Sequence, residues 1–148
     1  MDLIEGFKQL TTRAEREEAI MLLQELSLAG VEDGTRTEID TSLEEVICNG
    51  IYSRQITLKK GTCAVGEIHK QEHLNILSSG SVLVFTNEGM EQVDAPHRWV
   101  GKPGVKRASF ALEDTVWTTI HATTNTSSED IRNEFVAESF DDVPRLEE

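Results

Sequence analysis

Residues 61–80, which read GTCAVGEIHKQEHLNILSSG, decide how this chain is interpreted. Glu67, His69 and His73 all lie at odd positions, so in one extended strand their side chains would point to the same face. Two imidazoles and one carboxylate that point together form the ligand set of a facial triad, which suits Fe, Mn, Zn or Ni. The segment therefore predicts one of two things: a divalent metal site at Glu67, His69 and His73, or polar side chains that are hydrogen-bonded inside the fold or partly solvated at its edge.

The sequence on both sides of this segment has the pattern of short β-strands. Residues 51–58 are rich in β-branched side chains, and strand-like runs follow at 62–69, 73–77, 81–86, 90–94, 97–101, 107–112 and 115–121. Turn signals separate them, such as NEG at 87–89, where Gly89 suits a left-handed turn position. About eight short strands with regular turns predict a β-sandwich or a jelly-roll barrel.

The segment 61–80 resembles the first motif of the cupins, in which His-x-His is followed by Glu and then by Gly. Glu67-x-His69 stands at the His-x-His pair, His73 at the Glu position, and Gly80 follows after six intervening residues. The resemblance implies a cupin-type barrel, in which the fourth ligand, usually His, would fall at Arg107. Because a guanidinium stays protonated, Arg107 is not expected to ligate a metal, and it would oppose a cation or contact an anion.

Further residues near the end of the predicted barrel are candidates for a pocket or a partner contact. His121 and Trp117 share one face of the last predicted strand, where the alternative for both is ordinary packing. Lys102 and Lys106 form a basic turn with Arg107. That turn is either solvated or a contact point for an acidic partner.

Helices are predicted at both ends of the chain. The first thirty residues follow a helical period, with a capping box at Thr12-x-x-Glu15 and a stop at Gly30. A second capping box at Thr126-x-x-Glu129 predicts a short helix over 128–138. The predicted fold class is therefore mainly β: a cupin-type jelly-roll barrel (50–122) with an N-terminal helical arm and linker (1–49) and a C-terminal helix with an acidic tail (123–148).

The net charge of −13 limits the partners of the chain. It argues against direct nucleic-acid binding and against anionic membranes, since both require a basic face. The charge is uneven: residues 1–50 carry −8, residues 51–110 carry +3, and residues 111–148 carry −8. Cys48 and Cys63 lack the spacing of a zinc or redox motif, and the N-terminus does not resemble a signal peptide. We therefore expect a protein of a reducing cytoplasm.

The stretch 50–121 also resembles small cupin-like proteins of tailed bacteriophages, through the phrases GIYSRQITLKKGT, GEIHKQEHLNILSSG, KPGVKR and LEDTVWTTIHAT. This resemblance implies a non-enzymatic homo-oligomer, a dimer or larger. It would serve as a virion structural or accessory protein that contacts other phage proteins, in the host cytoplasm or in the virion. Two alternatives stay open: a metal-dependent cupin enzyme acting on a small molecule, and an acidic inhibitor of host defence.

Overall fold

The computed structural model describes residues 3–32 and 43–137. Their helices and strands occur in the order α1 (Leu3–Lys8), α2 (Arg13–Glu32), β1 (Glu44–Cys48), β2 (Ile51–Leu58), β3 (Cys63–Val65), β4 (Ile68–His69), β5 (His73–Ser79), β6 (Ser81–Thr86), β7 (Gly89–Asp94), β8 (His97–Gly101), β9 (Arg107–Ala111), β10 (Thr115–Ala122), α3 (Ser128–Phe135) and β11 (Val136–Ala137). None of the described helices is long and apolar enough to cross a membrane.

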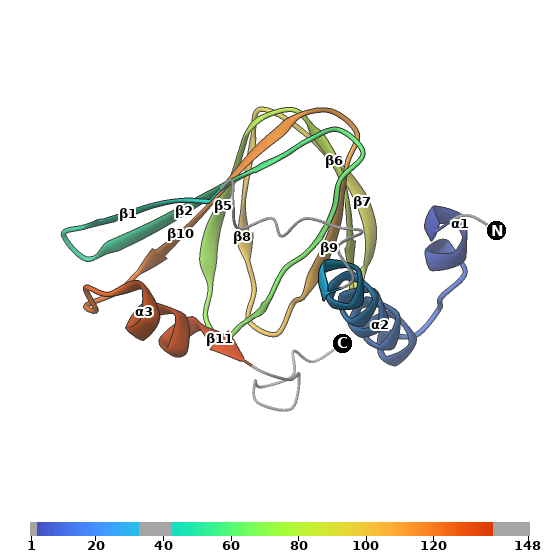
Figure 1. The fold of residues 1–148 in the computed structure, drawn as a ribbon, viewed down its shortest axis with the longest axis horizontal. Coiled ribbons are helices and arrows are strands. Elements are labelled where there is room, and N and C mark those ends of the chain that lie inside the picture. Colours follow the sequence, from blue (N-terminus) through green and yellow to red (C-terminus); the bar gives the residue numbers. More distant parts are fainter. Residues whose placement is uncertain (1–2, 33–42, 138–148) are drawn as a thin grey trace.

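Two antiparallel sheets face each other and form the body of the molecule (Figure 1). One has the order β1-β2-β10-β5-β8 and the other the order β3-β9-β6-β7, while β11 and β4 pair separately. When the eight main strands, β2, β3 and β5 to β10, are numbered along the chain, the sheets have the orders 1-8-3-6 and 2-7-4-5. This is the connectivity of a jelly roll, and it confirms the predicted fold class. The described strands form two facing sheets and not one closed ladder.

The alternation of side chains along β6 shows how the two hydrophobic cores are divided. Val82 and Val84 face the space between the sheets, where they pack with Leu77 and Trp117. Leu83 and Phe85 alternate with these valines and face the opposite side. There they pack under the helices, in a cluster with Phe7, Ile20 and Ala108. Both faces of β6 are therefore buried, which explains its nearly continuous apolar sequence.

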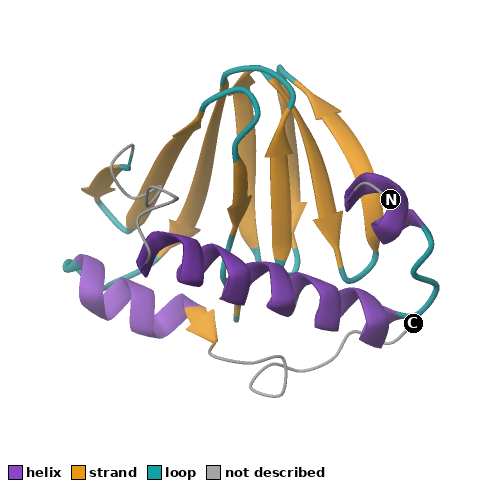
Figure 2. Cartoon of the chain, turned by 45° about the vertical axis from the view of Figure 1, so that its right-hand side comes forward, coloured by secondary structure: helices purple, strands orange, loops and turns teal. Residues whose placement is uncertain are grey.

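The N-terminal helices cover the second sheet of their own chain (Figure 2). The Thr12 and Glu15 capping box forms as predicted, with the Glu15 amide donating to Thr12 Oγ1 and the Thr12 amide donating to Glu15 Oε2. Asn87, which is fully buried, donates to Glu17 Oε1 at 3.1 Å and links the helix to the β6–β7 turn. Among the described residues, the buried side chains of α1 and α2 therefore pack on the sheet of their own chain and are not available to a partner.

Several predicted boundaries were wrong. Helix α2 continues through Gly30 to Glu32, and the C-terminal helix is capped by Ser127 in place of Thr126 and ends at Phe135. Strand β1 occupies part of the segment predicted as a loop, and the run 62–69 divides into β3 and β4. Gly89 has a positive φ of 140°, which lies outside the left-handed helical region predicted for it. The predicted end of the C-terminal helix, beyond 137, lies outside the described residues.

Candidate metal centre

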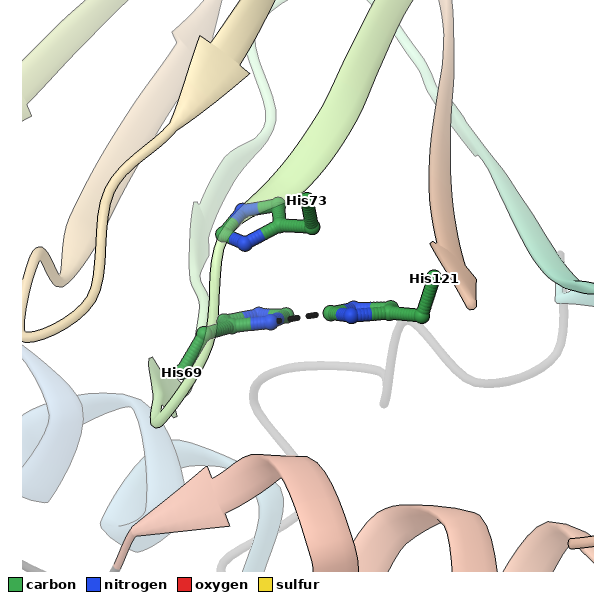
Figure 3. Close-up of side chains that lie close together, drawn as sticks. All are labelled: His69, His73 and His121. Carbon is green, nitrogen blue, oxygen red and sulfur yellow. Dashed lines mark hydrogen bonds between the residues drawn. The ribbon is translucent and has the colours of Figure 1, made fainter. Parts of the chain in front are cut away.

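Three histidines from separate strands meet at one end of the barrel (Figure 3). His69 ends β4, His73 begins β5, and His121 lies next to the end of β10. Because β5 and β10 are antiparallel neighbours, the start of one and the end of the other lie at the same end of the sheet. One nitrogen of each ring lies within 4.8 Å of those of the other two.

The backbone around the histidines fixes their positions. His73 lies opposite Gly101 in the β5–β8 ladder, and a Cβ at Gly101 would overlap the His73 ring. His69 pairs with Val136 of β11, and its carbonyl accepts from the Gly104 amide at 2.9 Å. The absence of a side chain at Gly101 therefore leaves the space that the His73 ring occupies.

The hydrogen bonds of His73 determine which of its nitrogens is available. Its Nδ1 lies 3.0 Å from the Gln71 carbonyl oxygen, which only accepts, so Nδ1 carries the proton. In the neutral ring Nε2 then holds a lone pair, and this buried atom has no hydrogen-bond partner among the described residues. The Nδ1 of His121 is also buried and without a partner there. Two of the three rings thus have a buried nitrogen without a hydrogen-bond partner among the described residues.

All three imidazoles are held in the neutral form. Burial lowers the pKa of His69 to about 2, assisted by His73, His121 and the guanidinium groups of Arg107 and Arg54. Burial also lowers the pKa of His121 to about 4, with a smaller contribution from His73. The pKa of His73 is lowered mainly by burial, against the hydrogen bond to Gln71. Neutral imidazoles are the form in which histidine binds a metal.

Glu67, the predicted third ligand, is not part of this cluster. Its side chain is 28% exposed and pairs with Arg132 of α3. Residues 67, 69 and 73 do not lie in one extended strand, because β4 ends at His69 and a bend precedes β5. The odd-position argument therefore does not apply across the bend. The structure brings His69 and His73 together, and His121 takes the place that the prediction gave to Glu67.

The other candidate residues occupy different environments. Along β9, Arg107 has the same inward alternation as Ser109 and Ala111, which pair with the inward Val84 and Val82. Trp117 packs in the core, and its indole N–H donates to Asn75 Oδ1 at 3.0 Å.

The predicted basic turn is divided between surface and interior. Lys102 is exposed, whereas Lys106 is buried, and this burial lowers its pKa. The three cations therefore do not form one basic surface.

Residues 128–137, which we call the C-terminal cover, close the histidine end of the barrel. The Phe135 ring lies 4.1 Å from the His121 ring, and the Phe135 carbonyl accepts from the Lys70 amide at 2.6 Å. Glu134 accepts hydrogen bonds from Thr123 and Asn125, at 2.9 and 2.5 Å. These contacts place α3 and β11 over the three histidines.

The donor set fits a transition-metal ion. Imidazole nitrogen suits Zn, Fe and Ni, and three protein ligands leave a coordination position for a further ligand. In tetrahedral geometry, metal–nitrogen distances of about 2.1 Å place the ligand nitrogens about 3.4 Å apart. Since the three nitrogens lie within 4.8 Å of one another, the widest pair would close by up to about 1.4 Å on binding. The three histidines are placed to hold one ion.

Comparison with solved structures gives fold-level similarity at low sequence identity. A cupin-2 domain protein from Shewanella frigidimarina aligns over 63% of this chain and 90% of its own, at 13% identity and a TM-score of 0.47. An uncharacterized double-stranded β-helix protein from Klebsiella pneumoniae aligns over 62% of this chain and 92% of its own, at 14% identity and a TM-score of 0.49. An acetylacetone dioxygenase from Acinetobacter johnsonii aligns over 54% of this chain and 58% of its own, at 14% identity and a TM-score of 0.46. No protein-family model matches the sequence, and no curated protein does.

Proposed function

We propose that this chain is a metal-binding jelly-roll protein that holds one divalent transition-metal ion through His69, His73 and His121. The observation that carries the proposal is the orientation of His73. Its Nδ1 proton is committed to a backbone carbonyl, which leaves a buried Nε2 lone pair, and one nitrogen of each of the three neutral imidazoles lies within 4.8 Å of the other two. Outer hydrogen bonds of this kind fix the tautomer of metal-binding histidines.

The chemistry that such an ion supplies is Lewis acidity or redox capacity at its open position. The protein contributes three neutral ligands, of which His73 and His121 are buried, and the C-terminal cover, which controls entry. This arrangement supports the metal-dependent small-molecule enzyme among the functions considered from the sequence. It assigns no general acid or base.

The fourth histidine provides a matched control for the metal test. His97 is exposed and stacks on Trp99, outside the cluster. After loading with Zn²⁺ or Fe²⁺ and desalting, elemental analysis should find about one ion per chain in the wild type, in His97→Ala and in Glu67→Gln. His121→Ala should bind the metal at least tenfold more weakly. Equal metal content in His121→Ala and the wild type would refute the proposed ligand set.

A second candidate function is the oligomeric structural or accessory role in a bacteriophage. Association with a second copy is supported by the β1–β2 hairpin, which projects from the sheet (Figure 1) and exposes the apolar side chains of Val46, Ile47 and Ile51. The bacteriophage role rests on the sequence resemblance alone. Strand β1 is also an edge strand, and such an edge offers unpaired backbone groups to a second copy.

Light scattering would test this second function directly. The wild type should be a dimer or larger, and Ile47→Lys should shift the mass toward the monomer. Mass spectrometry of purified particles would then decide whether the protein is a virion component. A wild type that is monomeric and absent from particles would contradict it.

A further inference from the structure

The interior around the three histidines carries positive charge without a compensating carboxylate. The charged groups that lower the pKa of His69 and His73 include Arg107, and Arg54 also acts on His69. No carboxylate contributes to the pKa of any of the three histidines. Glu67, two residues before His69, is paired with Arg132 instead, and Glu72, next to His73, is exposed.

Arg107 has no counter-charge in direct contact among the described residues. It is mostly buried, and it forms no ion pair within 4.0 Å and no side-chain hydrogen bond with them. Burial lowers the pKa of Arg107, and Glu88 and Glu91, both exposed, raise it in part. None of the Arg107 nitrogens is among the fully buried atoms that lack a partner, so they keep some contact with solvent and are available to a ligand.

A second inward donor is also unsatisfied. Asn75 is 1% exposed, and its Oδ1 accepts from Trp117 Nε1 and Thr119 Oγ1. Its Nδ2 is buried without a hydrogen-bond partner among the described residues. This Nδ2 lies beside His73, since both contact the space where a Gly101 Cβ would stand. The same strand face therefore presents a metal ligand and a free N–H group.

A bound divalent ion would increase the charge imbalance. Three neutral imidazoles leave the full +2 charge of the ion uncompensated, and the Arg107 guanidinium adds a further positive charge. In a buried site, such charges attract an anion strongly. The flat fork of a guanidinium matches the two oxygens of a carboxylate.

We infer that the three-histidine centre binds a small carboxylate, held by the guanidinium of Arg107 and the amide of Asn75. This inference rests on the proposed metal-binding function and names the ligand class of the same site. It explains why a guanidinium stands where the cupin resemblance implies a fourth metal ligand. The anion, and not a protein side chain, balances the charge.

The test uses ¹³C-formate, whose NMR line broadens when it binds to the protein. The Zn²⁺-loaded wild type should broaden the formate line, and unlabelled acetate should reverse the effect. Arg107→Met should keep about one Zn²⁺ per chain and weaken formate binding about tenfold or more. Arg98→Met removes the same charge from an exposed position on β8, and it should behave as the wild type.

Further arms separate failure of the inference from failure of the proposed function. Formate binding that is absent, or unchanged in Arg107→Met while Zn²⁺ is retained, overturns the inference alone. A wild type without Zn²⁺ refutes the metal function. In that case the metal-free protein is titrated with formate. Formate binding that the wild type shows and Arg107→Met loses supports the anion site, and no formate binding to the wild type overturns it.

One further variant covers failure to fold, and a competition experiment covers the ligand class. Arg107→Lys keeps the charge if Arg107→Met does not fold, and it should bind formate with intermediate affinity. Full wild-type affinity in Arg107→Lys would overturn the role of the guanidinium fork. Displacement of formate by phosphate but not by acetate would overturn the carboxylate class.

Discussion

His69 and His121 are 52 residues apart in the chain, yet His69 Nδ1 lies 3.2 Å from His121 Nε2. Their rings are nearly parallel, with an interplanar angle of 4°. At this distance one nitrogen donates a proton and the other accepts it. Because burial lowers the pKa of both rings, the pair that shares this hydrogen bond is neutral. A third proton on this pair would create an unpaired buried charge.

The first prediction is a loss of stability in mild acid. Unfolded histidine has a pKa of about 6.5, whereas the folded values are about 2 for His69 and about 4 for His121. Below pH 6.5 the unfolded chain therefore binds protons that the folded chain excludes. The stabilising contribution is complete above pH 6.5 and is lost as pH falls toward the folded pKa values.

Urea unfolding of the metal-free protein at several pH values would measure this loss. Between pH 6.5 and 5, each of the two histidines should lower the free energy of unfolding by about 2 kcal/mol. His121→Asn should reduce the slope, and His97→Asn should leave it unchanged. Identical slopes in His121→Asn and the wild type would contradict the neutral cluster.

The second prediction concerns Gly101. In Gly101→Ala the new methyl group overlaps the His73 ring and approaches Asn75 Nδ2 to 2.8 Å. We expect a loss of about 1–3 kcal/mol of unfolding free energy and weaker metal binding, because His73 must move. Gly66→Ala is the control, since its Cβ would meet only the Arg107 carbonyl at 3.6 Å. Wild-type metal affinity in Gly101→Ala would show that His73 is not a ligand.

The third prediction is that the C-terminal cover limits the exchange of bound metal. Phe135→Leu removes the ring that contacts His121 and retains the backbone pairing of β11 with β4. A chelator should extract the metal faster from this variant, at a stability cost of about 1 kcal/mol. Stopped-flow chelation with a chromogenic ligand measures the rate. If the extraction rate does not change, entry to the site does not pass the cover at Phe135.

The fourth prediction concerns the docking of the N-terminal arm. Asn87 Nδ2 donates to Glu17 Oε1 and to the Gly104 carbonyl, and Asn87 is fully buried. Asn87→Ala should lower the free energy of unfolding by about 1–3 kcal/mol, since it leaves buried acceptors unsatisfied. Glu88→Ala, at the adjacent exposed position, should have little effect. Thermal unfolding would compare the two variants.

The strands of the barrel could be predicted because each one carries a local signal. Between 51 and 122, apolar or β-branched runs alternate with Gly or Pro turns, and every predicted run contains a strand. Strand β1 lacked this signal, since Glu44 and Glu45 open it and all five of its residues are exposed. Pairing with β2 forms this strand, and no hydrophobic alternation marks it in the sequence.

The site could be predicted only in part, because its third histidine is distant in sequence. His69 and His73 belong to one local motif, whereas His121 is brought to them by the pairing of β10 with β5. The strand-parity argument placed Glu67 with them, and it failed at the bend between β4 and β5. His121 was among the candidates because it follows the core residue Trp117 on the same strand face.

The order of the chain has a consequence for how the site acquires its ion. All three histidines precede residue 122, and the cover that closes over them follows it. During synthesis on the ribosome, the ligands emerge before α3 and β11. A growing chain therefore offers an open centre to the metal ions of the cell, whereas the finished protein offers a closed one. We expect the identity of the bound ion to depend on which metals are present while the protein is being made.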